Sequence, residues 1–564
     1  MSPDPINIVI GGEAGQGLIT IGQLLTKSLV RSGYEVLVTQ DYQSRIRGGH
    51  NTFRVRASAE PLAAPQESID LLVALDSATV DLHRPELSPR GIILIDEDLS
   101  TPDDCCRKIP FKKLAPERYA NITALGVVST LLGLREEIVV QAADDFFGPK
   151  SPEAAAGNRQ ALQAAFTWTK KQSISFPSLP AAPDTATKLI LTGNEALALG
   201  ALSAGLKFFA FYPMSPSTSI GLTLAAQARK MGLVVEQAED EIAAINMALG
   251  ASFAGAPSMV ATSGGGFALM AEGVSLAGMT ETPLVIVVAQ RPGPATGLPT
   301  RTEQGDLEFV LHAGHGEFPR AIFTPGSVEE CFHLTRKALE LAERSQGPVF
   351  ILTDQFLADS YRAADPFDLS QLPAILPRTT PAITEPYLRY ALTESGVSPR
   401  LFPGLSDHLV VADSDEHTED GHLTEELTVR KRMVEKRGRK LKLLQEAAVP
   451  PEFRGEPRPD LLLVTWGSGR GAVGEAAALL KAQGKRTAVL LFSQVWPLVP
   501  DHFLPVFQEA GEIISVEMNA TGQFSRLLRR ETGTHLAKTI LRYDGLPLTP
   551  EYILREMEQR GWLR

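Results

Sequence analysis

The stretch VVEQAEDEIAAINMALGASFAGAPSMVATSGGGFALM, from Val234 to Met270, decides how the middle of this chain folds. A short strand ends in three acidic residues, a helix built from small residues follows, and a second strand closes on three glycines. Negative charge in a first helical turn is favourable, so Glu239, Asp240 and Glu241 could simply cap the helix. However, the Ala- and Gly-rich helix leaves its backbone open to close approach. A carboxylate with a catalytic role is therefore the alternative to capping.

Length and composition indicate a water-soluble protein with several domains. The 564 residues, of which 44% are hydrophobic, suffice for about three or four domains. A net charge of -12 argues against nucleic-acid and membrane-surface binding, because both need a basic face. No apolar run approaches the roughly 18 residues of a membrane span, and the start MSPDPINIVIGG lacks the pattern of an export signal. We expect a cytoplasmic protein.

The three cysteines, Cys105, Cys106 and Cys331, do not form a metal-binding pattern. No pair has the CxxC spacing of metal and cluster sites, and two adjacent cysteines cannot close one cluster by themselves. We predict that all three are structural and that this chain holds no metal. Any redox metal is then expected on another polypeptide.

The N-terminal region begins with a βαβ unit at residues 6–40, whose first turn reads GGEAGQG. Such a turn lets backbone N–H groups face an anion at the start of the following helix. Its glycine order is neither GxGxxG nor that of a P-loop, so a tight turn that binds no ligand is an alternative. The arginines of the SRIRGG loop that follows could likewise be solvated surface residues that bind no phosphate. The candidate phosphate-binding residues are Gly12, Gly15, Gly17, Arg45 and Arg47.

Strand, turn and helix patterns recur along the chain, so the predicted fold class is α/β with three α/β domains. The Pro-rich segment FPSLPAAPDTATK marks a linker, and a charge-rich stretch before the last domain predicts a solvated connection with a charged helix. The predicted parts are a first domain at 1–150, a helix and linker at 151–187, a second domain at 188–365, a connecting segment at 366–458 and a third domain at 459–564.

In the second domain, polar side chains follow predicted strands where α/β sheets bind ligands. Ser215 lies in YPMSPSTS, Arg291 stands at the exit of the apolar strand PLVIVVA, and Arg301 lies in the Gly/Pro-rich loop beyond it. A guanidinium is a natural bidentate partner for a carboxylate. The hydroxyls could alternatively cap the next helix.

Several motifs in matching order resemble 2-oxoacid:ferredoxin oxidoreductases, most closely the 2-oxoglutarate type. The α-subunit motifs are GNEALALGALSAGLKFFAFYPMSPSTS, VEQAEDEIAAINMALGASFAGA, ATSGGGFALM and RPGPATGLPTRTEQGDL. TWGSGRGAVGEA and VEMNATGQFSRLLR are similar to that subunit's C-terminal domain. GGEAGQGLITIGQLL with SRIRGGHNTFRV is similar to the family's γ component, here fused ahead of α. The resemblance implies a γ-type domain associated with coenzyme A, a thiamine pyrimidine-binding-type domain and a transketolase C-terminal-like domain.

The chemistry implied by the resemblance is the reversible, thiamine diphosphate-dependent oxidative decarboxylation of a 2-oxoacid with coenzyme A. The products are carbon dioxide and an acyl-CoA, which is succinyl-CoA when the substrate is 2-oxoglutarate. The electrons pass to ferredoxin, and the reverse reaction fixes carbon dioxide. A separate β subunit shares the thiamine diphosphate and holds Mg²⁺ and a [4Fe-4S] cluster, and the two chains form an α2β2 assembly.

The resemblance also implies roles for individual residues. Glu241, nine residues before Gly250, matches the glutamate that hydrogen-bonds the aminopyrimidine ring of thiamine and favours the tautomer that removes a proton from the thiazolium carbon. Ser215 stands at the hydroxyl position of a YPxTPS motif, where threonine is commoner. Arg291 matches the arginine that binds the substrate carboxylate, and Arg301 is a candidate second clamp for a dicarboxylic acid. The glycine turn with Arg45 and Arg47 is the candidate site for coenzyme A.

Three other functions compete with this one. A shared scaffold does not fix the substrate pocket, so pyruvate, branched-chain or aryl 2-oxoacids are alternative substrates. The chain could instead be a non-catalytic subunit for coenzyme A binding or assembly. A nicotinamide-dependent dehydrogenase is disfavoured by the glycine order of the first turn.

Overall fold

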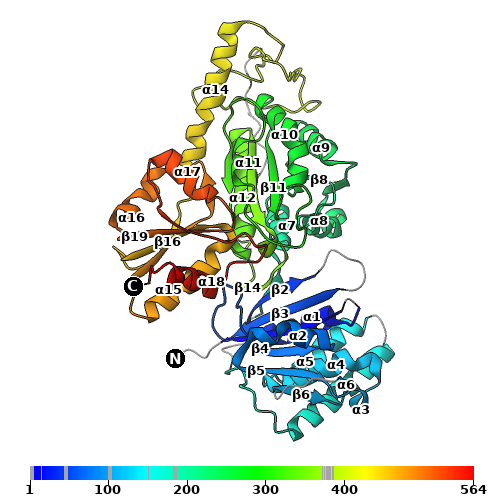
Figure 1. The fold of residues 1–564 in the computed structure, drawn as a ribbon. Helices are drawn as coiled ribbons and strands as arrows, with labels where there is room; N and C mark the ends of the chain where they lie inside the picture. Colours follow the sequence, from blue (N-terminus) through cyan, green and yellow to red (C-terminus); the bar gives the residue numbers. More distant parts are fainter. Residues whose placement is uncertain are drawn as a thin grey trace. The chain divides into compact units, whose positions relative to one another are not determined.

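The computed structural model describes residues 5–13, 15–42, 49–99, 105–149, 152–181, 187–370, 372–373, 375, 383 and 386–563. The chain is mixed α/β with three sheets, as predicted from the sequence (Figure 1). It divides into two compact units. The first comprises Met1–Leu191, Asp359–Phe367 and Thr549–Glu551, and the second comprises the rest of the chain.

The first unit is built on an eight-stranded sheet, in the order β6-β5-β4-β1-β3-β2-β14-β7. Its strands are β1 (Ile6–Glu13), β2 (Glu35–Asp41), β3 (His50–Ser58), β4 (Ile69–Ala74), β5 (Leu87–Asp96), β6 (Cys106–Ile109), β7 (Leu189–Leu191) and β14 (Tyr361–Ala364). Alternate residues of β1 face opposite sides of the sheet: Ile8 and Ile10 enter the core below the helices, and Val9 enters a smaller core on the other side.

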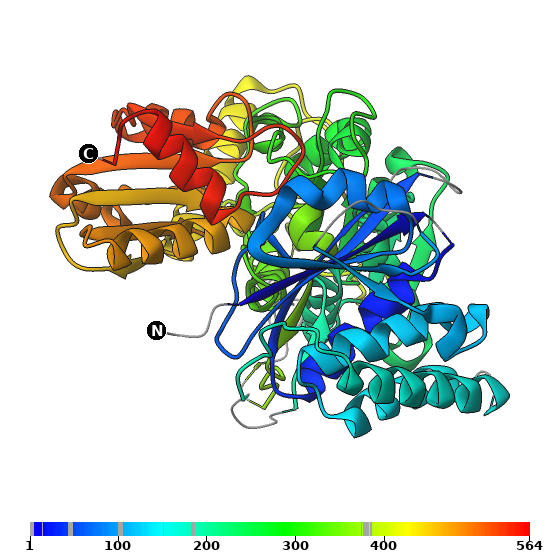
Figure 2. The same cartoon turned by 60° about the horizontal axis from the view of Figure 1, so that its bottom comes forward.

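Helices cover the larger core of this sheet (Figure 2). They are α1 (Leu18–Arg31), α4 (Ala120–Leu131), α5 (Glu136–Phe147) and α6 (Pro152–Lys171), while the short α2 (Ser77–His83) and α3 (Phe111–Leu114) lie in the connections. Helix α1 contacts α4 and α5, and α6 contacts both of these. Buried residues such as Leu25 and Leu162 lie at these contacts, so burial of apolar area holds the helices on the sheet.

Two short strands of this sheet come from segments that the sequence assigned to the second domain. Residues 189–191 and 361–364 pair with each other, and the latter also pair with β2, all antiparallel. The two strands stand at the start and at the end of the predicted second domain, 188–365. Backbone hydrogen bonds from β14 to the open edge of β2, and between β14 and β7, satisfy the polar groups of these strands.

The second unit contains a seven-stranded sheet in the order β18-β12-β13-β11-β10-β8-β9. Its strands are β8 (Phe208–Phe211), β9 (Val234–Gln237), β10 (Ser258–Thr262), β11 (Leu284–Gln290), β12 (Ala321–Phe323), β13 (Pro348–Asp354) and β18 (Gln494–Trp496). All but β18 pair in parallel. Every residue of β11 is buried, as expected for a central parallel strand covered on both faces.

The helices of this sheet are α7 (Gly193–Ser203), α8 (Thr218–Met231), α9 (Glu241–Phe253), α10 (Gly264–Met279), α11 (Leu307–His312), α12 (Val328–Ser345) and α13 (Gln355–Asp359). A second sheet of the same unit has the order β15-β17-β16-β19-β20. Its strands are β15 (Glu452–Gly455), β16 (Leu461–Trp466), β17 (Thr487–Phe492), β19 (Glu512–Glu517) and β20 (Lys538–Leu541), with α15 (Arg470–Ala482), α16 (Leu504–Glu509), α17 (Gln523–Thr532) and α18 (Pro550–Gln559). One core joins the two sheets, with Ile286 and Val464 among its members.

The connecting segment differs from the prediction of a solvated charged helix. Its helix α14 (Leu427–Glu446) buries Lys436, Arg437 and Lys440. Lys436 Nζ lies 2.6 Å from Glu281 Oε1, and Lys440 pairs with the other oxygen. Burial alone would raise the pKa of Glu281, but the two lysines and a nearby arginine lower it to about 2. Because buried Glu281 and half-buried Glu416 pair with these cations, this part of the basic run packs against the rest of the chain.

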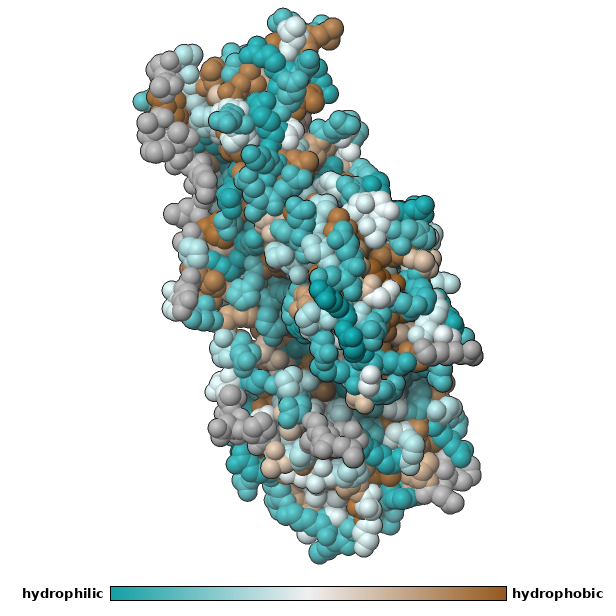
Figure 3. All heavy atoms as spheres, turned by 90° about the vertical axis from the view of Figure 1, so that its left-hand side faces the viewer, coloured by the Kyte–Doolittle hydropathy of each residue, from teal (hydrophilic) through white to brown (hydrophobic). Residues whose placement is uncertain are grey.

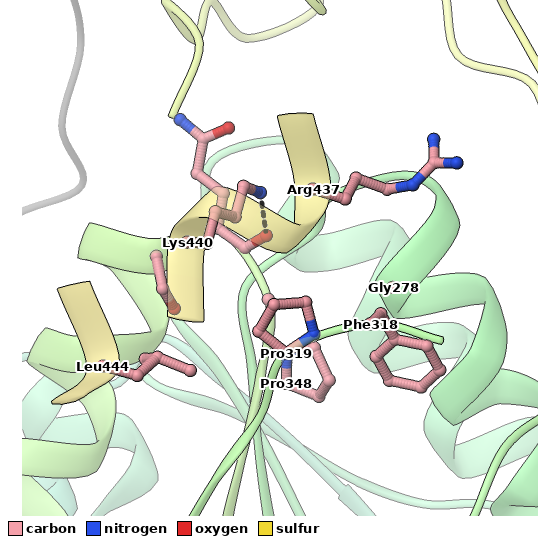
Figure 4. Close-up of a pocket in the computed structure, with 10 residues that line it drawn as sticks. Gly278, Phe318, Pro319, Pro348, Arg437, Lys440 and Leu444 are labelled. Carbon is pink, nitrogen blue, oxygen red and sulfur yellow. Dashed lines mark hydrogen bonds between the residues drawn. The ribbon is translucent and has the colours of Figure 1, made fainter. Parts of the chain in front are cut away.

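Figure 4 shows how Lys440 is seated, donating a hydrogen bond to the Gln346 carbonyl oxygen at 3.0 Å. Pro319 and Pro348 lie below the helix. The cavity beside them measures about 10 Å³, which holds at most about one water molecule. Helix α14 is therefore closely packed against the loops of Pro319 and Pro348, and the space between them is too small for a ligand.

The face drawn in Figure 3 is largely hydrophilic, with hydrophobic residues scattered among polar ones. Within the part of the chain that the structure describes, no helix combines the length and the apolar character that crossing a membrane requires.

Candidate active site

Glu241 and the two acidic residues before it have separate roles. Asp240 is the N-cap of α9, because its side chain accepts a hydrogen bond from the backbone N–H of Ala243 at 2.7 Å. Glu239 is exposed. Glu241 is only 3% exposed, and its Oε1 has no hydrogen-bond partner among the described residues. Capping therefore accounts for Asp240 and leaves Glu241 unexplained, since a buried carboxylate without partners is costly.

The glycine run at the start of α10 lies against Glu241. A Cβ atom on Gly266 would stand 2.2 Å from Glu241 Oε1 and 2.2 Å from Thr262 Oγ1, so no larger residue fits there without displacing them. Ser263, the N-cap of α10, makes no capping hydrogen bond with its side chain, and its buried Oγ has no partner among the residues described. The first turn of α10 thus offers backbone N–H groups and unused polar atoms to a bound group.

Ser215 and Arg291 meet at the same edge of the sheet. Ser215 follows β8, is exposed and begins a cis peptide bond to Pro216, while Arg291 directly follows β11. Arg291 Nη1 donates a hydrogen bond to the carbonyl oxygen of Ser215 at 2.8 Å. Because β10 lies between β8 and β11, the two residues flank the strand that leads into the glycine run. The fold therefore gathers Ser215, Arg291 and Glu241 at one sheet edge.

Asp306 is a member of this site that sequence reasoning missed. Its Oδ2 is buried without a partner in the described structure, and it lies 2.4 Å from the place a Cβ on Gly264 would occupy. Burial raises the pKa of Asp306 to about 6, although the nearby Arg291 acts to lower it. Its backbone N–H donates to Gln290 Oε1 at 2.9 Å. An aspartate in a Gly/Pro-rich loop is an ordinary turn residue, so the sequence carried no signal for this burial.

Arg301 lies in a different setting from Arg291. Its Cβ and Cγ pack against Gly545, within 3.1 and 3.3 Å of the place of an added Cβ. The following residue, Thr302, donates its backbone N–H to the Gly545 carbonyl at 3.1 Å. The loop of Arg301 is thus attached to the C-terminal region, and a role for Arg301 in substrate binding stays a prediction.

The glycine turn of the first unit has the backbone expected of an open helix start. Gly15 and Gly17 have φ values of 101° and 80°, in the region that favours glycine. Gly17 is the N-cap of α1, so no side chain caps this helix. Gly12 lies beside Gln16, whose Oε1 would be 2.3 Å from an added Cβ. Arg45 and Arg47, the predicted basic residues of the site, lie outside the described residues.

Comparison with known proteins shows where this chain belongs. A family model described as "Pyruvate flavodoxin/ferredoxin oxidoreductase, thiamine diP-bdg" matches residues 199–436. A second model, "Pyruvate ferredoxin/flavodoxin oxidoreductase", matches residues 7–168. The chain is 30% identical to the 2-oxoacid:ferredoxin oxidoreductase subunit alpha of Saccharolobus solfataricus, over 99% of this chain and 98% of that protein. It belongs to the 2-oxoacid:ferredoxin oxidoreductase family.

Within this family, the relatives include the 2-oxoglutarate type. The chain is 27% identical to the 2-oxoglutarate oxidoreductase subunit KorA of Mycobacterium tuberculosis, over 93% of this chain and 87% of that protein. The solved structure of 2-oxoglutarate:ferredoxin oxidoreductase from Magnetococcus marinus, with 2-oxoglutarate, coenzyme A and succinyl-CoA bound, is 32% identical and covers 100% of both chains with a TM-score of 0.95. The resemblance to this family is thereby confirmed: this 2-oxoacid:ferredoxin oxidoreductase chain is an α subunit with a γ-type region fused at its N-terminus.

Proposed function

We propose that this chain is the α subunit of an enzyme that oxidatively decarboxylates 2-oxoglutarate with coenzyme A, forming succinyl-CoA and carbon dioxide and passing electrons to ferredoxin. The observation that carries the proposal is Glu241 Oε1, which is buried and has no partner among the described residues, at the sheet edge where Arg291 and Ser215 meet. The names of the KorA relative and of the Magnetococcus marinus enzyme support 2-oxoglutarate as the substrate.

The unpaired Oε1 fits thiamine diphosphate, because an aminopyrimidine ring nitrogen would supply the partner that this oxygen lacks. When bound, thiamine diphosphate supplies the carbon nucleophile and the electron sink of the reaction. Glu241 would hold this ring nitrogen and exchange a proton with it at Oε1, as a positioned acid–base group does. Gly266 and Gly264 let the carboxylates of Glu241 and Asp306 lie against the first turn of α10, since an added Cβ would stand 2.2 Å from Glu241 Oε1 and 2.4 Å from Asp306 Oδ2.

Arg291 and Ser215 make the substrate end of this site. The hydrogen bond from Arg291 to the Ser215 carbonyl fixes the guanidinium, which then binds the carboxylate next to the 2-oxo group. The Ser215 hydroxyl is exposed and free to rotate toward the same substrate. Arg301 is the candidate partner for the second carboxylate of a dicarboxylic substrate.

The remaining components follow from the family. A separate β subunit completes the thiamine site and carries Mg²⁺ and a [4Fe-4S] cluster, in an α2β2 assembly that works in the cytoplasm. Coenzyme A is held by the γ-type region at the glycine turn of Gly12, Gly15 and Gly17. Backbone N–H groups at the uncapped start of α1 support a phosphate there.

The test is steady-state reduction of ferredoxin by the chain reconstituted with its β subunit, with a panel of 2-oxoacids and with and without coenzyme A. The proposal predicts turnover that needs coenzyme A and a kcat/KM for 2-oxoglutarate above those for pyruvate, branched-chain and aryl 2-oxoacids. A preference for pyruvate would refute the dicarboxylate role of Arg301. An inactive complex that still binds thiamine diphosphate would favour a non-catalytic assembly role.

A further inference from the structure

The loop that joins β11 to α11, residues 291–306, is attached near its end to the five-stranded sheet of the same unit. Backbone N–H groups at alternate positions bind acceptors of that sheet and of the segments that follow its strands. At distances of 2.6 to 3.1 Å, Thr302 donates to the Gly545 carbonyl, Gln304 to the Met518 carbonyl and Glu308 to Gln523 Oε1. The segment 302–308 is thus held from outside at three points.

Gln304 is the buried centre of this contact and is only 1% exposed. Its Oε1 accepts a hydrogen bond from the Met518 N–H at 3.4 Å. Its Nε2 donates to Asp354 Oδ2 at 3.2 Å and to the Trp466 carbonyl at 3.4 Å. Gly467 leaves space for this amide, since an added Cβ would lie 3.0 Å from Nε2. Gln304 therefore lies across the carboxyl ends of β16 and β19.

Gln523 makes the reciprocal contact from the first turn of α17. Its Nε2 donates to the Gly305 carbonyl at 2.7 Å, and its Oε1 accepts from the Glu308 N–H. One side-chain amide thus binds the backbone on both sides of Asp306. The helix start is itself fixed, because Glu517 accepts the two N–H groups that follow Gln523 in the chain.

The attached segment carries Asp306 to the candidate active site. Asp306 Oδ2 is buried beside the first turn of α10, and its backbone N–H donates to Gln290 Oε1 at 2.9 Å. Gln290 directly precedes Arg291, whose guanidinium binds the Ser215 carbonyl. Both ends of the loop therefore meet at the exit of β11, one through Arg291 and the other through Asp306.

The five-stranded sheet uses the carboxyl ends of its strands for this contact. That edge is where an α/β sheet commonly binds a ligand, and here it receives the side chain and backbone of Gln304. A buried amide whose nitrogen and oxygen are both bonded holds its neighbours in one arrangement. By contrast, the exposed ion pair of Arg526 with Glu308, at 3.3 Å, contributes little.

We propose that Gln304 and Gln523 are positioning residues for the 2-oxoacid, because they order the loop of Arg291 and Asp306 before the substrate arrives. The inference rests on the proposed function, since it concerns the same substrate site. A loop that is not held in advance must be ordered by the substrate, and this ordering weakens binding. Loss of the contact should therefore act on the KM for the substrate, with kcat preserved.

The kinetic test uses Gln523→Met, which removes both hydrogen bonds and keeps the length and helix propensity of the side chain. In the reconstituted complex it should raise the KM for 2-oxoglutarate about five- to thirtyfold, as expected for two lost hydrogen bonds. The kcat should stay near the wild-type value, because bound substrate orders the loop before the chemistry. The KM for coenzyme A should not change. Arg529→Gln, an exposed change on the same helix, is the control and should keep the wild-type KM.

Hydrogen exchange of the same complexes measures the attachment without turnover. In Gln523→Met, residues 302–308 should exchange faster than in the wild type, while continued protection of α17 shows that the helix is folded. An unchanged KM for 2-oxoglutarate would overturn the inference even if this segment exchanges faster, and so would a lower kcat alone. A wild-type complex that turns over no 2-oxoacid would instead refute the proposed function. Exchange would then decide the attachment by itself, and an unchanged rate for residues 302–308 would overturn it.

Discussion

Glu241 and Glu517 are both buried carboxylates beside the first turn of a helix, and both lie in the second compact unit. Glu517 uses both oxygens. Its donors are the backbone N–H groups of Phe524 and Ser525, the hydroxyls of Ser515 and Ser525, Asn519 Nδ2 and Trp466 Nε1, at 2.7 to 3.4 Å. Glu241 Oε1 has no partner in the described chain.

The difference separates a carboxylate whose hydrogen bonds all come from the fold from one whose Oε1 has no partner in the described chain. A buried charge is tolerated when hydrogen bonds replace the water it has lost. Glu517 receives all of these bonds from its own domain, joining β19 to α17. Glu241 Oε1 receives no such hydrogen bond within the described chain, so we infer that a bound group provides one. Asp306 Oδ2 and Ser263 Oγ share this property at the same helix start.

The largest expected effect is on turnover. Glu241→Gln should lower kcat of the reconstituted complex by about 10²- to 10⁴-fold, the usual contribution of a positioned acid or base. The exposed neighbour gives the control, since Glu239→Gln should retain normal turnover. Steady-state ferredoxin reduction measures both. Near-normal turnover of the Glu241 variant would remove it from the mechanism.

Glu517→Gln should act on stability instead. Its amide NH2 would face the donors that now bind the carboxylate, so we expect a loss of about 3–5 kcal/mol, as for other broken buried networks. Chemical unfolding followed by circular dichroism gives this value. A variant as stable as the wild type would mean that the network around Glu517 contributes little.

Asp306→Asn should raise stability in a pH-dependent way. Because burial raises the folded pKa from 3.8 to about 6, ionising Asp306 costs the folded state free energy. The cost is absent below pH 4, where both states are protonated, and is complete above pH 6. A pKa raised by about two corresponds to roughly 3 kcal/mol at most. Unfolding midpoints at pH 5 and pH 8 should show a gain for the variant that is larger at pH 8, and an equal gain at both would contradict this account. The exposed Asp81→Asn is the control.

The smallest effect is expected at Ser215. Ser215→Ala keeps the backbone carbonyl that holds Arg291 and removes only the hydroxyl. Loss of one hydrogen bond of about 1 kcal/mol predicts a KM for the 2-oxoacid that rises about fivefold. A rise of a hundredfold would show that the hydroxyl does more than bind substrate.

Local pattern predicted the strands and helix starts around this candidate site, and the resemblance supplied the roles that stay predictions; long-range burial explains what both missed. The apolar run of β11 and the acidic start of α9 are readable in the sequence because their signals lie within a few residues. Glu241 could be chosen over Asp240 only through the resemblance, since both suit a first turn. Burial of Lys436 depends on Glu281, 155 residues away in the sequence, and nothing in the basic run indicates that partner. Asp306 was missed for the same reason.

Heat unfolding of the reconstituted complex, with and without thiamine diphosphate and Mg²⁺, tests most directly whether Glu241 lacks an internal partner. The account predicts that Glu241→Gln without cofactor unfolds at or above the wild-type temperature and gains less than the wild type when cofactor is added. Glu517→Gln should unfold at a lower temperature in both conditions. A Glu241 variant that loses stability without cofactor and gains as much from it as the wild type would contradict the account.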